Sequence, residues 1–140
     1  MIVIADTGAV VGLVDADDRH HAALKRLFAV TGDAWVLPWA ILPEVDYLLS
    51  SHVGERSSRA FLGDLAEGHF RVEWGDEGDL VRAFELCRRH RALAPGLVDA
   101  TVVAIAERLG AQAIVTLDLR DFSAMVGARG PKLWPRDWSD

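Results

Sequence analysis

The sequence contains a single cysteine, Cys87, among its 140 residues. One thiol cannot form an internal disulfide, and it cannot supply the thiolates of a structural zinc site. Long hydrophobic runs are also missing, because Asp6 interrupts the apolar opening Ile2–Ala5. This opening is too short for a membrane span or a signal peptide, so we expect a cytoplasmic protein without a membrane partner. A glycine-rich phosphate-binding loop is absent as well.

Positive charge is in short supply, since 15 Lys and Arg stand against 21 Asp and Glu, for a net charge of −6. Proteins that bind nucleic acid usually carry basic patches, so this balance argues against such a partner. The objection weakens if some carboxylates gather in one site. Four of them set aside would leave −2, and bound divalent cations would invert the local sign.

Hydrophobic residues make up 51% of the sequence, and its length fits a single domain over residues 1–140. Apolar, β-branched runs predict strands, and a 3.6-residue apolar period predicts helices between them. The expected strands cover residues 2–5, 35–37, 70–74, 113–117 and 132–134. The expected helices cover residues 9–14, 20–30, 39–51, 54–67, 77–91 and 97–109. This alternation predicts an α/β fold with a central parallel sheet and helices on both faces.

The apolar faces of two helices can be assigned from their periodicity. In the helix over 54–67 we expect the apolar face to consist of Ala60, Phe61 and Leu65. In the helix over 77–91 we expect the core to receive Leu80, Val81, Phe84 and either Leu86 or Cys87.

Four acidic residues stand at topologically related ends of these elements. Asp6 and Asp118 each directly follow a predicted strand, while Glu44 and Asp99 lie in the first turns of predicted helices. In open parallel sheets, ligands bind beyond the carboxyl ends of the strands. Taken singly, each acid is explained as a turn residue or a favourable helix start. The four together predict one acidic site.

Clustered carboxylates repel one another, and a pair about 4 Å apart costs roughly 4 kcal/mol at an effective dielectric near 20. Such a cluster persists with raised pKa values or with a bound cation. All-oxygen ligands favour Mg²⁺ or Mn²⁺ over zinc, and these ions activate water and neutralise phosphate charge. The candidate catalytic and metal-binding residues are Asp6, Glu44, Asp99 and Asp118.

The order and spacing of these pieces resemble the PIN-domain nucleases and, among them, the VapC-type toxins of bacterial toxin–antitoxin pairs. The segments that carry the resemblance are residues 4–8, 17–23, 43–49, 97–106 and 116–122. Gly8 stands where the family usually has Ser or Asn. Asp118 matches the family's fourth acid best. Asp121 is a candidate for an assisting role, although a turn residue before a buried Phe122 explains it as well. Thr7 and Thr116 are further candidates for an assisting role.

The resemblance implies a three-layer α/β/α PIN-like fold and a metal-dependent endoribonuclease. Its substrate would be structured RNA, either transfer RNA or ribosomal RNA, cleaved at phosphodiester bonds by metal-activated water. It also implies a toxin homodimer and a tight-binding protein antitoxin that occludes the site. DNA would be contacted only indirectly, through the antitoxin.

A basic run, Arg88, Arg89 and Arg91, stands at the end of the helix predicted over 77–91. Cations are favoured at a helix C-terminus without any ligand. The alternative is an edge that contacts RNA phosphates beside Asp99. Further candidates for RNA binding are Arg120, Arg129, Lys132 and Arg136.

Two other functions compete with a nuclease. A phosphatase of the aspartyl-phosphate type needs a second Asp two residues after the nucleophile and a later Lys. Here position 8 is Gly, and no Lys occurs between Lys25 and Lys132. A catalytically inactive PIN-fold module that only binds protein is the second alternative, and the four intact acids argue against it.

Overall fold

The computed structural model describes residues 1–139 and contains one five-stranded, fully parallel sheet. Its strands follow the spatial order β3-β2-β1-β4-β5. They are β1 (Val3–Ala5), β2 (Trp35–Pro38), β3 (Arg71–Glu73), β4 (Ala113–Val115) and β5 (Lys132–Trp134). The central strand β1 is fully buried and pairs Val3 with both Trp35 and Ala113. Strands buried on both faces are continuously apolar, as the sequence pattern predicts.

Helices connect successive strands. They are α1 (Thr7–Val14), α2 (His21–Thr31), α3 (Leu42–His52), α4 (Glu55–Ala66), α5 (Glu77–Arg89), α6 (Leu97–Leu109) and α7 (Leu119–Val126). Short 3₁₀ segments precede β2 and α3, at Gly32–Ala34 and Trp39–Ile41. Across residues 1–139, none of the helices combines the length and the apolar character that a membrane crossing requires.

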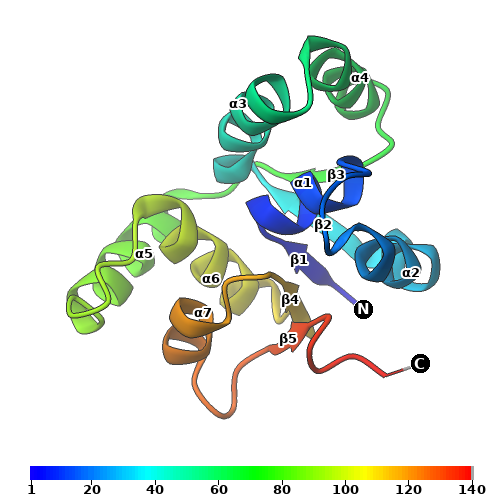
Figure 1. The fold of residues 1–140 in the computed structure, drawn as a ribbon. Coiled ribbons are helices and arrows are strands. Elements are labelled where there is room, and N and C mark those ends of the chain that lie inside the picture. Colours follow the sequence, from blue (N-terminus) through cyan, green and yellow to red (C-terminus); the bar gives the residue numbers. More distant parts are fainter. Residues whose placement is uncertain (140) are drawn as a thin grey trace.

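The helices form two layers, one on each face of the sheet (Figure 1). Helix α1 packs on α2 and α3, and α3 packs on α4, whereas α6 packs on α5 and α7. The strand order explains this separation. The chain leaves β1 toward β2 and β3 and later returns to β4 and β5 on the other side, and right-handed crossovers then place the two sets of helices on opposite faces. The predicted three-layer α/β/α fold is confirmed.

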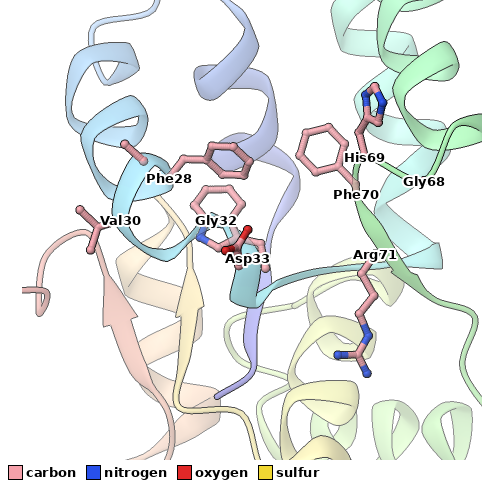
Figure 2. Close-up of a pocket in the computed structure, with 10 residues that line it drawn as sticks. Phe28, Val30, Gly32, Asp33, Gly68, His69, Phe70 and Arg71 are labelled. Atoms are coloured by element: carbon pink, nitrogen blue, oxygen red, sulfur yellow. The ribbon is translucent and has the colours of Figure 1, made fainter.

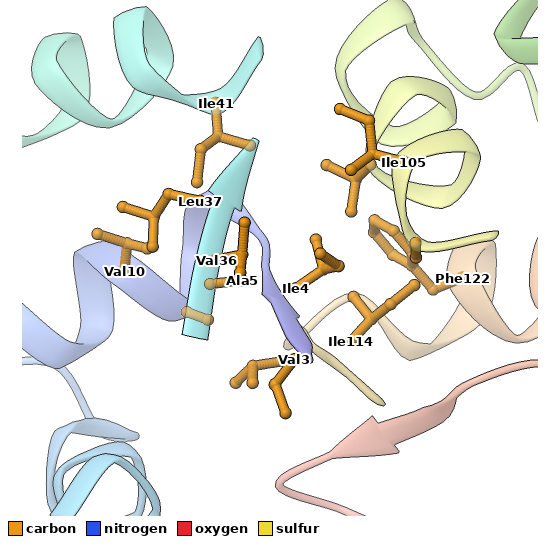
Figure 3. Close-up of a cluster of buried hydrophobic side chains, with 14 of the residues drawn as sticks. Val3, Ile4, Ala5, Val10, Val36, Leu37, Ile41, Ile105, Ile114 and Phe122 are labelled. Atoms are coloured by element: carbon orange, nitrogen blue, oxygen red, sulfur yellow. The ribbon is translucent and has the colours of Figure 1, made fainter. Parts of the chain in front are cut away.

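The core fills the space between the sheet and both helix layers. Figure 3 shows Val10 and Ile41 approaching the sheet from one layer, and Ile105 and Phe122 approaching it from the other. All four side chains are completely buried. Burying each of these large side chains contributes about 1.5–3 kcal/mol relative to leaving it in water.

Arg108, in the last turn of α6, ties this helix to α5 and β3. Its Nε and Nη2 atoms donate to the two carboxylate oxygens of Asp79, at 2.7 and 3.0 Å, and Nη2 also donates to Glu73 at 2.8 Å. Asp79 is only 3% exposed, and the hydrogen-bonded guanidinium lowers the pKa of its carboxyl group. Because α6 also carries Asp99 in its first turn, these contacts help to fix the direction of an element of the candidate site.

The structure corrects several expectations. Helix α7 was not predicted at all, and residues 39–41 form a 3₁₀ turn before α3 instead of the start of an α-helix. The expected inward faces are wrong at Ala60, which is exposed, and along α5. There Leu80, Val81 and Phe84 are 50%, 62% and 67% exposed. The buried face of α5 carries Leu86, as expected, but its other members are Asp79 and Ala83, because the Asp79–Arg108 ion pair and the small Ala83 side chain lie toward α6.

Candidate functional site

The switch point of the sheet lies between β1 and β4, where the connections leave in opposite directions. Open α/β sheets bind their ligands at this point, beyond the carboxyl ends of the strands. Asp6 directly follows β1, and Asp118 lies three residues beyond the end of β4. The fold therefore brings both aspartates to the edge of the sheet where the sequence predicts a site.

Five carboxylates stand at the starts of four helices around this point. Asp6 and Asp118 occupy the N-cap positions of α1 and α7, and the first turns of α3, α6 and α7 contain Glu44, Asp99 and Asp121. Helix N-termini carry partial positive charge, which favours carboxylates and other anions nearby. Four convergent helix starts thus hold a group of acids that would repel one another.

Asp6 is buried to 6% exposure but does not cap its helix, because its side chain makes no capping hydrogen bond to α1. Its Oδ2 atom accepts a hydrogen bond from the Thr116 hydroxyl at 3.0 Å, while its Oδ1 atom is buried without a partner within residues 1–139. Burial and the charge of Asp99 raise the pKa of Asp6 from 3.8 to about 7. A buried carboxylate oxygen without a hydrogen bond is costly, so helix capping does not explain this residue.

Thr116 links the two strand ends. It is fully buried, its hydroxyl donates to Asp6, and the same oxygen accepts the backbone N–H of Asp118 at 3.0 Å. The hydroxyl of Thr7, beside Asp6, is buried and has no hydrogen-bond partner within the described chain. Thr116 therefore holds Asp6 in one orientation, whereas Thr7 leaves a second oxygen unsatisfied beside it.

Asp99, Asp118 and Asp121 come close enough to share an ion, because one carboxylate oxygen of each lies within 4.8 Å of the others. Burial and the charges of Asp118 and Glu44 raise the pKa of Asp99 from 3.8 to about 6. Asp118 also accepts the backbone N–H of Asp121 at 3.4 Å, a long contact that starts α7. Like-charge repulsion thus extends across the whole cluster, from Asp6 to Asp121.

The residues of this cluster fit a hard divalent cation. Every donor is a carboxylate or hydroxyl oxygen, which Mg²⁺ and Mn²⁺ prefer, and a cation would satisfy the unpaired Oδ1 of Asp6. It would also relieve the repulsion that raises the pKa values of Asp6 and Asp99. The residues that could hold it are Asp6, Glu44, Asp99, Asp118 and Asp121.

The structure brings together all four acids that the sequence singled out, and it places with them Asp121, which the sequence offered only as an assisting candidate. Arg120 is an exposed residue in the first turn of α7, between two of the clustered acids. Arg88, Arg89 and Arg91 are exposed at the end of α5 and lie outside the acidic group. Their roles stay predictions.

A hollow of about 440 Å³ lies at the other end of the sheet, where β2 and β3 begin (Figure 2). The hollow lies between the end of α2 and the turn before β3. There the aromatic rings of Phe28 and Phe70 face each other in a tilted contact. None of the clustered carboxylates lines it. Its position at the amino ends of the strands separates it from the candidate site.

Comparison with known proteins places this arrangement in a family. The family model described as "PIN domain" matches residues 3–127. The ribonuclease VapC26 of Mycobacterium tuberculosis is 31% identical over 123 residues, which cover 88% of this chain and 91% of that protein.

Solved structures agree with this placement. Mycobacterium tuberculosis VapC20, described as a sarcin–ricin loop cleaving toxin, has a TM-score of 0.79 and 27% identity, covering 87% of this chain and 94% of that one. The DNA-bound VapBC of Salmonella typhimurium shares the fold, with a TM-score of 0.70 at 16% identity, over 95% of this chain and 96% of that one. The chain therefore belongs to the PIN domain family and, within it, to the VapC-type proteins.

Proposed function

We propose that this protein is a Mg²⁺- or Mn²⁺-dependent endoribonuclease that acts as the toxin of a toxin–antitoxin pair. The proposal rests on Asp6, whose buried carboxylate lies beside Asp99 and Glu44 and has one oxygen without a hydrogen-bond partner among the described residues. The similarity of the chain to the ribonuclease VapC26, and to VapC20, described as a sarcin–ricin loop cleaving toxin, supports RNA as the substrate.

The catalytic and metal-binding residues in this proposal are Asp6, Glu44, Asp99 and Asp118, assisted by Asp121, Thr7 and Thr116. When bound, the ion supplies an activated water and charge neutralisation at the phosphate. Thr116 holds Asp6 Oδ2 by its hydroxyl and leaves Oδ1 for the ion. The converging N-termini of α1, α3, α6 and α7 favour an anionic phosphate at the same place.

The substrate class in this proposal is structured RNA, either a transfer RNA or a ribosomal RNA. An acidic cluster by itself repels RNA, so cleavage should depend on the divalent cation, and the cation should strengthen RNA binding at the cluster. The protein would act in the cytoplasm, where such RNAs are found.

Two protein partners complete the proposal, a cognate antitoxin that occludes the site and a second copy of the chain. Solved relatives described as VapBC complexes support the antitoxin. For the homodimer, the exposed face of α5 offers Leu80, Val81 and Phe84 side by side, at 50–67% exposure. Contiguous exposed apolar side chains of this kind mark interaction surfaces. Contact with DNA would come only through the antitoxin.

The alternative function, a catalytically inactive PIN-fold module that binds protein, is separated by a cleavage assay. Purified protein is incubated with total bacterial RNA in Mn²⁺ or in EDTA, beside Asp99→Asn and the matched variant Glu77→Gln. Glu77 is an exposed acid in the first turn of α5, outside the cluster. We expect cleavage only in Mn²⁺, unchanged in Glu77→Gln and lost in Asp99→Asn. Intact RNA in Mn²⁺ with folded wild-type protein would support the inactive module.

The toxin role has its own test in cells. Induced expression of the wild-type chain in a bacterial host should arrest growth, Asp99→Asn should not, and co-expression of the cognate antitoxin should restore growth. Normal growth with abundant folded wild-type protein would refute the toxin role and leave the cleavage assay unaffected.

A further inference from the structure

A concave surface at the end of α5 is lined by four arginines and one carboxylate, around a hollow of about 370 Å³. The residues of this arginine pocket are Arg82, Glu85, Arg88, Arg89 and Arg91. We propose that it binds backbone phosphates of the RNA substrate beside the acidic cluster, and so positions the strand for cleavage. This inference rests on the proposed function and adds a docking site to it.

The charges of the pocket are unevenly paired. Arg82 is bound to Glu107 at 2.7 Å and to Glu85 at 3.2 Å. Within residues 1–139 the other three guanidinium groups have no ion pair, and the only hydrogen bond among them runs from Arg91 to the backbone carbonyl of Arg88 at 3.4 Å. Three unpaired guanidinium groups on one concave surface stand out in a chain with a net charge of −6.

Compensation of the helix dipole explains only part of this surface. Cations are stabilised within the last turn of a helix, where α5 places Arg88 and Arg89. Arg91 lies beyond the end of α5 but lines the same hollow. Compensation of the helix dipole does not require a concave surface. Binding of a phosphate group, by contrast, is favoured where several guanidinium groups surround the same space.

The pocket lies next to the element that carries Asp99. The thiol of Cys87, in the last turn of α5, is 3.4 Å from the carbonyl oxygen of Pro95. Pro95 is buried, and α6 begins two residues later. Since four residues of chain span at most about 14 Å, Asp99 and Pro95 stay within that distance. A few nucleotides of backbone can therefore reach from the pocket to the cluster.

Nucleic acid fits this surface better than a protein segment does. The core of a protein interface is apolar and depleted in charge, whereas the pocket is lined by charged residues alone. Guanidinium forks match phosphate oxygens in a bidentate geometry. On α5 the apolar side chains Leu80, Val81 and Phe84 precede the basic end, so the same helix can offer one face to protein and its end to RNA.

The test measures binding of fluorescently labelled bulk bacterial tRNA in EDTA, where metal-dependent cleavage cannot occur. Anisotropy titrations over a range of salt compare the wild type with Arg88→Ala/Arg89→Ala and with Lys25→Ala/Arg26→Ala. The control pair removes the same charge from two exposed positions on α2, which lies on the other side of the molecule (Figure 1). We expect the α5 variant to bind on the order of tenfold more weakly, and its salt slope to fall by about 1.4–1.8, the value for two lost phosphate contacts.

Two further variants distinguish the loss of phosphate contacts from misfolding of α5. Arg91→Ala, outside α5, should lower the slope by about 0.7–0.9. Arg88→Lys/Arg89→Lys should keep the wild-type slope while losing a few-fold in affinity, because lysine keeps the charge without the bidentate fork.

Equal weakening in the α5 and α2 pairs, or no weakening in either, would overturn the proposal. Unchanged tRNA binding together with weaker capture of the co-expressed antitoxin would also overturn it and assign the pocket to a protein. Cleavage by the wild type in Mn²⁺ is measured separately. If the wild type cleaves RNA and the arginine variants bind tRNA normally, only the proposal for the pocket is refuted. If tRNA binding depends on the arginines but the wild type does not cleave RNA, only the proposed function is refuted.

Discussion

Replacing Asp99 with Asn should make the metal-free protein more stable. Burial and the charges of Asp118 and Glu44 raise the pKa of Asp99 from 3.8 to about 6. About two pKa units correspond to roughly 3 kcal/mol of penalty for the charged form. The half-exposed position screens part of this penalty, and the lost helix-start charge costs a few tenths to 1 kcal/mol. We expect a net gain of about 1–2 kcal/mol above pH 7, or about 3–6 °C in melting temperature.

The stability difference between wild type and Asp99→Asn should depend on pH. A carboxyl group with a raised folded pKa stays protonated in the native state after the unfolded chain has lost the proton. The stability of metal-free wild type therefore falls as pH rises from about 4 to about 6, and Asp6 extends the fall to about pH 7. Asp99→Asn removes the first contribution and, because Asp99 also raises the pKa of Asp6, reduces the second. The two proteins should be about equally stable near pH 4 and diverge toward pH 7.

Urea unfolding and melting curves in EDTA, taken from pH 4 to pH 8, measure this difference, with Glu77→Gln as the control for an ordinary helix start. Adding Mn²⁺ at about 100 times its dissociation constant should stabilise the wild type by about 2.7 kcal/mol and the variant by much less. If Asp99 only starts its helix, the variant is less stable at every pH by up to about 1 kcal/mol and responds to Mn²⁺ like the wild type. That outcome would remove Asp99 from the metal site.

Three further predictions concern Thr116, Arg108 and Phe84. Thr116→Val removes the hydroxyl that holds Asp6, so kcat for RNA cleavage should fall about 10–100-fold, the usual cost of losing a ligand's supporting contact. Steady-state kinetics should show KM nearly unchanged and Thr116→Ser partly restoring the rate. Arg108→Ala leaves the buried carboxylate of Asp79 without its partner, and urea unfolding should show a loss of about 3 kcal/mol. Phe84→Glu places a charge on the exposed apolar face of α5, so light scattering should give a monomer mass for the variant and the proposed dimer mass for the wild type.

The positions of the strands and of the acids could be predicted from the sequence because both follow from local rules. In a strand such as Val3-Ile4-Ala5, apolar side chains point to both faces of the sheet, so both faces must be buried. A parallel sheet covered by helices on both sides buries them. Parallel strands bring their carboxyl ends to one edge, so Asp6 and Asp118 had to lie near each other once the fold class was known. Glu44 and Asp99 followed from the helix starts that face the same edge.

Helix α7 was missed although its signals are present. Asp118 accepts the Asp121 amide at the N-cap, Phe122 and Met125 are buried at helical spacing, and Gly127 ends the helix with a φ of +70°. Eight residues give too short a period to distinguish a helix from a loop with one buried aromatic side chain. The error mattered, because a helix start places Asp121 beside Asp118 and Asp99 as part of the cluster, whereas a turn residue has no fixed place there.

The buried face of α5 could not be predicted for a different reason. Periodicity alone places Leu80, Val81 and Phe84 inward, since they are the apolar residues of the helix. The packed face carries Asp79 instead, because its charge is matched by Arg108 from an element 29 residues away in sequence. No local pattern contains that partner, and the apolar side chains left outside form the surface that we propose for a second copy.

The net charge of −6 does not decide against a nucleic-acid partner, because charge acts locally. Several carboxylates elsewhere are already paired with arginines: Glu73, Asp79, Glu85, Glu107 and Asp137. In the proposed function the five acids of the cluster hold a cation, which would reverse their local effect on a phosphate. Arg88, Arg89 and Arg91 keep their charge free of ion pairs within residues 1–139. A phosphate that approaches this edge with metal bound therefore meets positive charge at both places, although the chain as a whole is acidic.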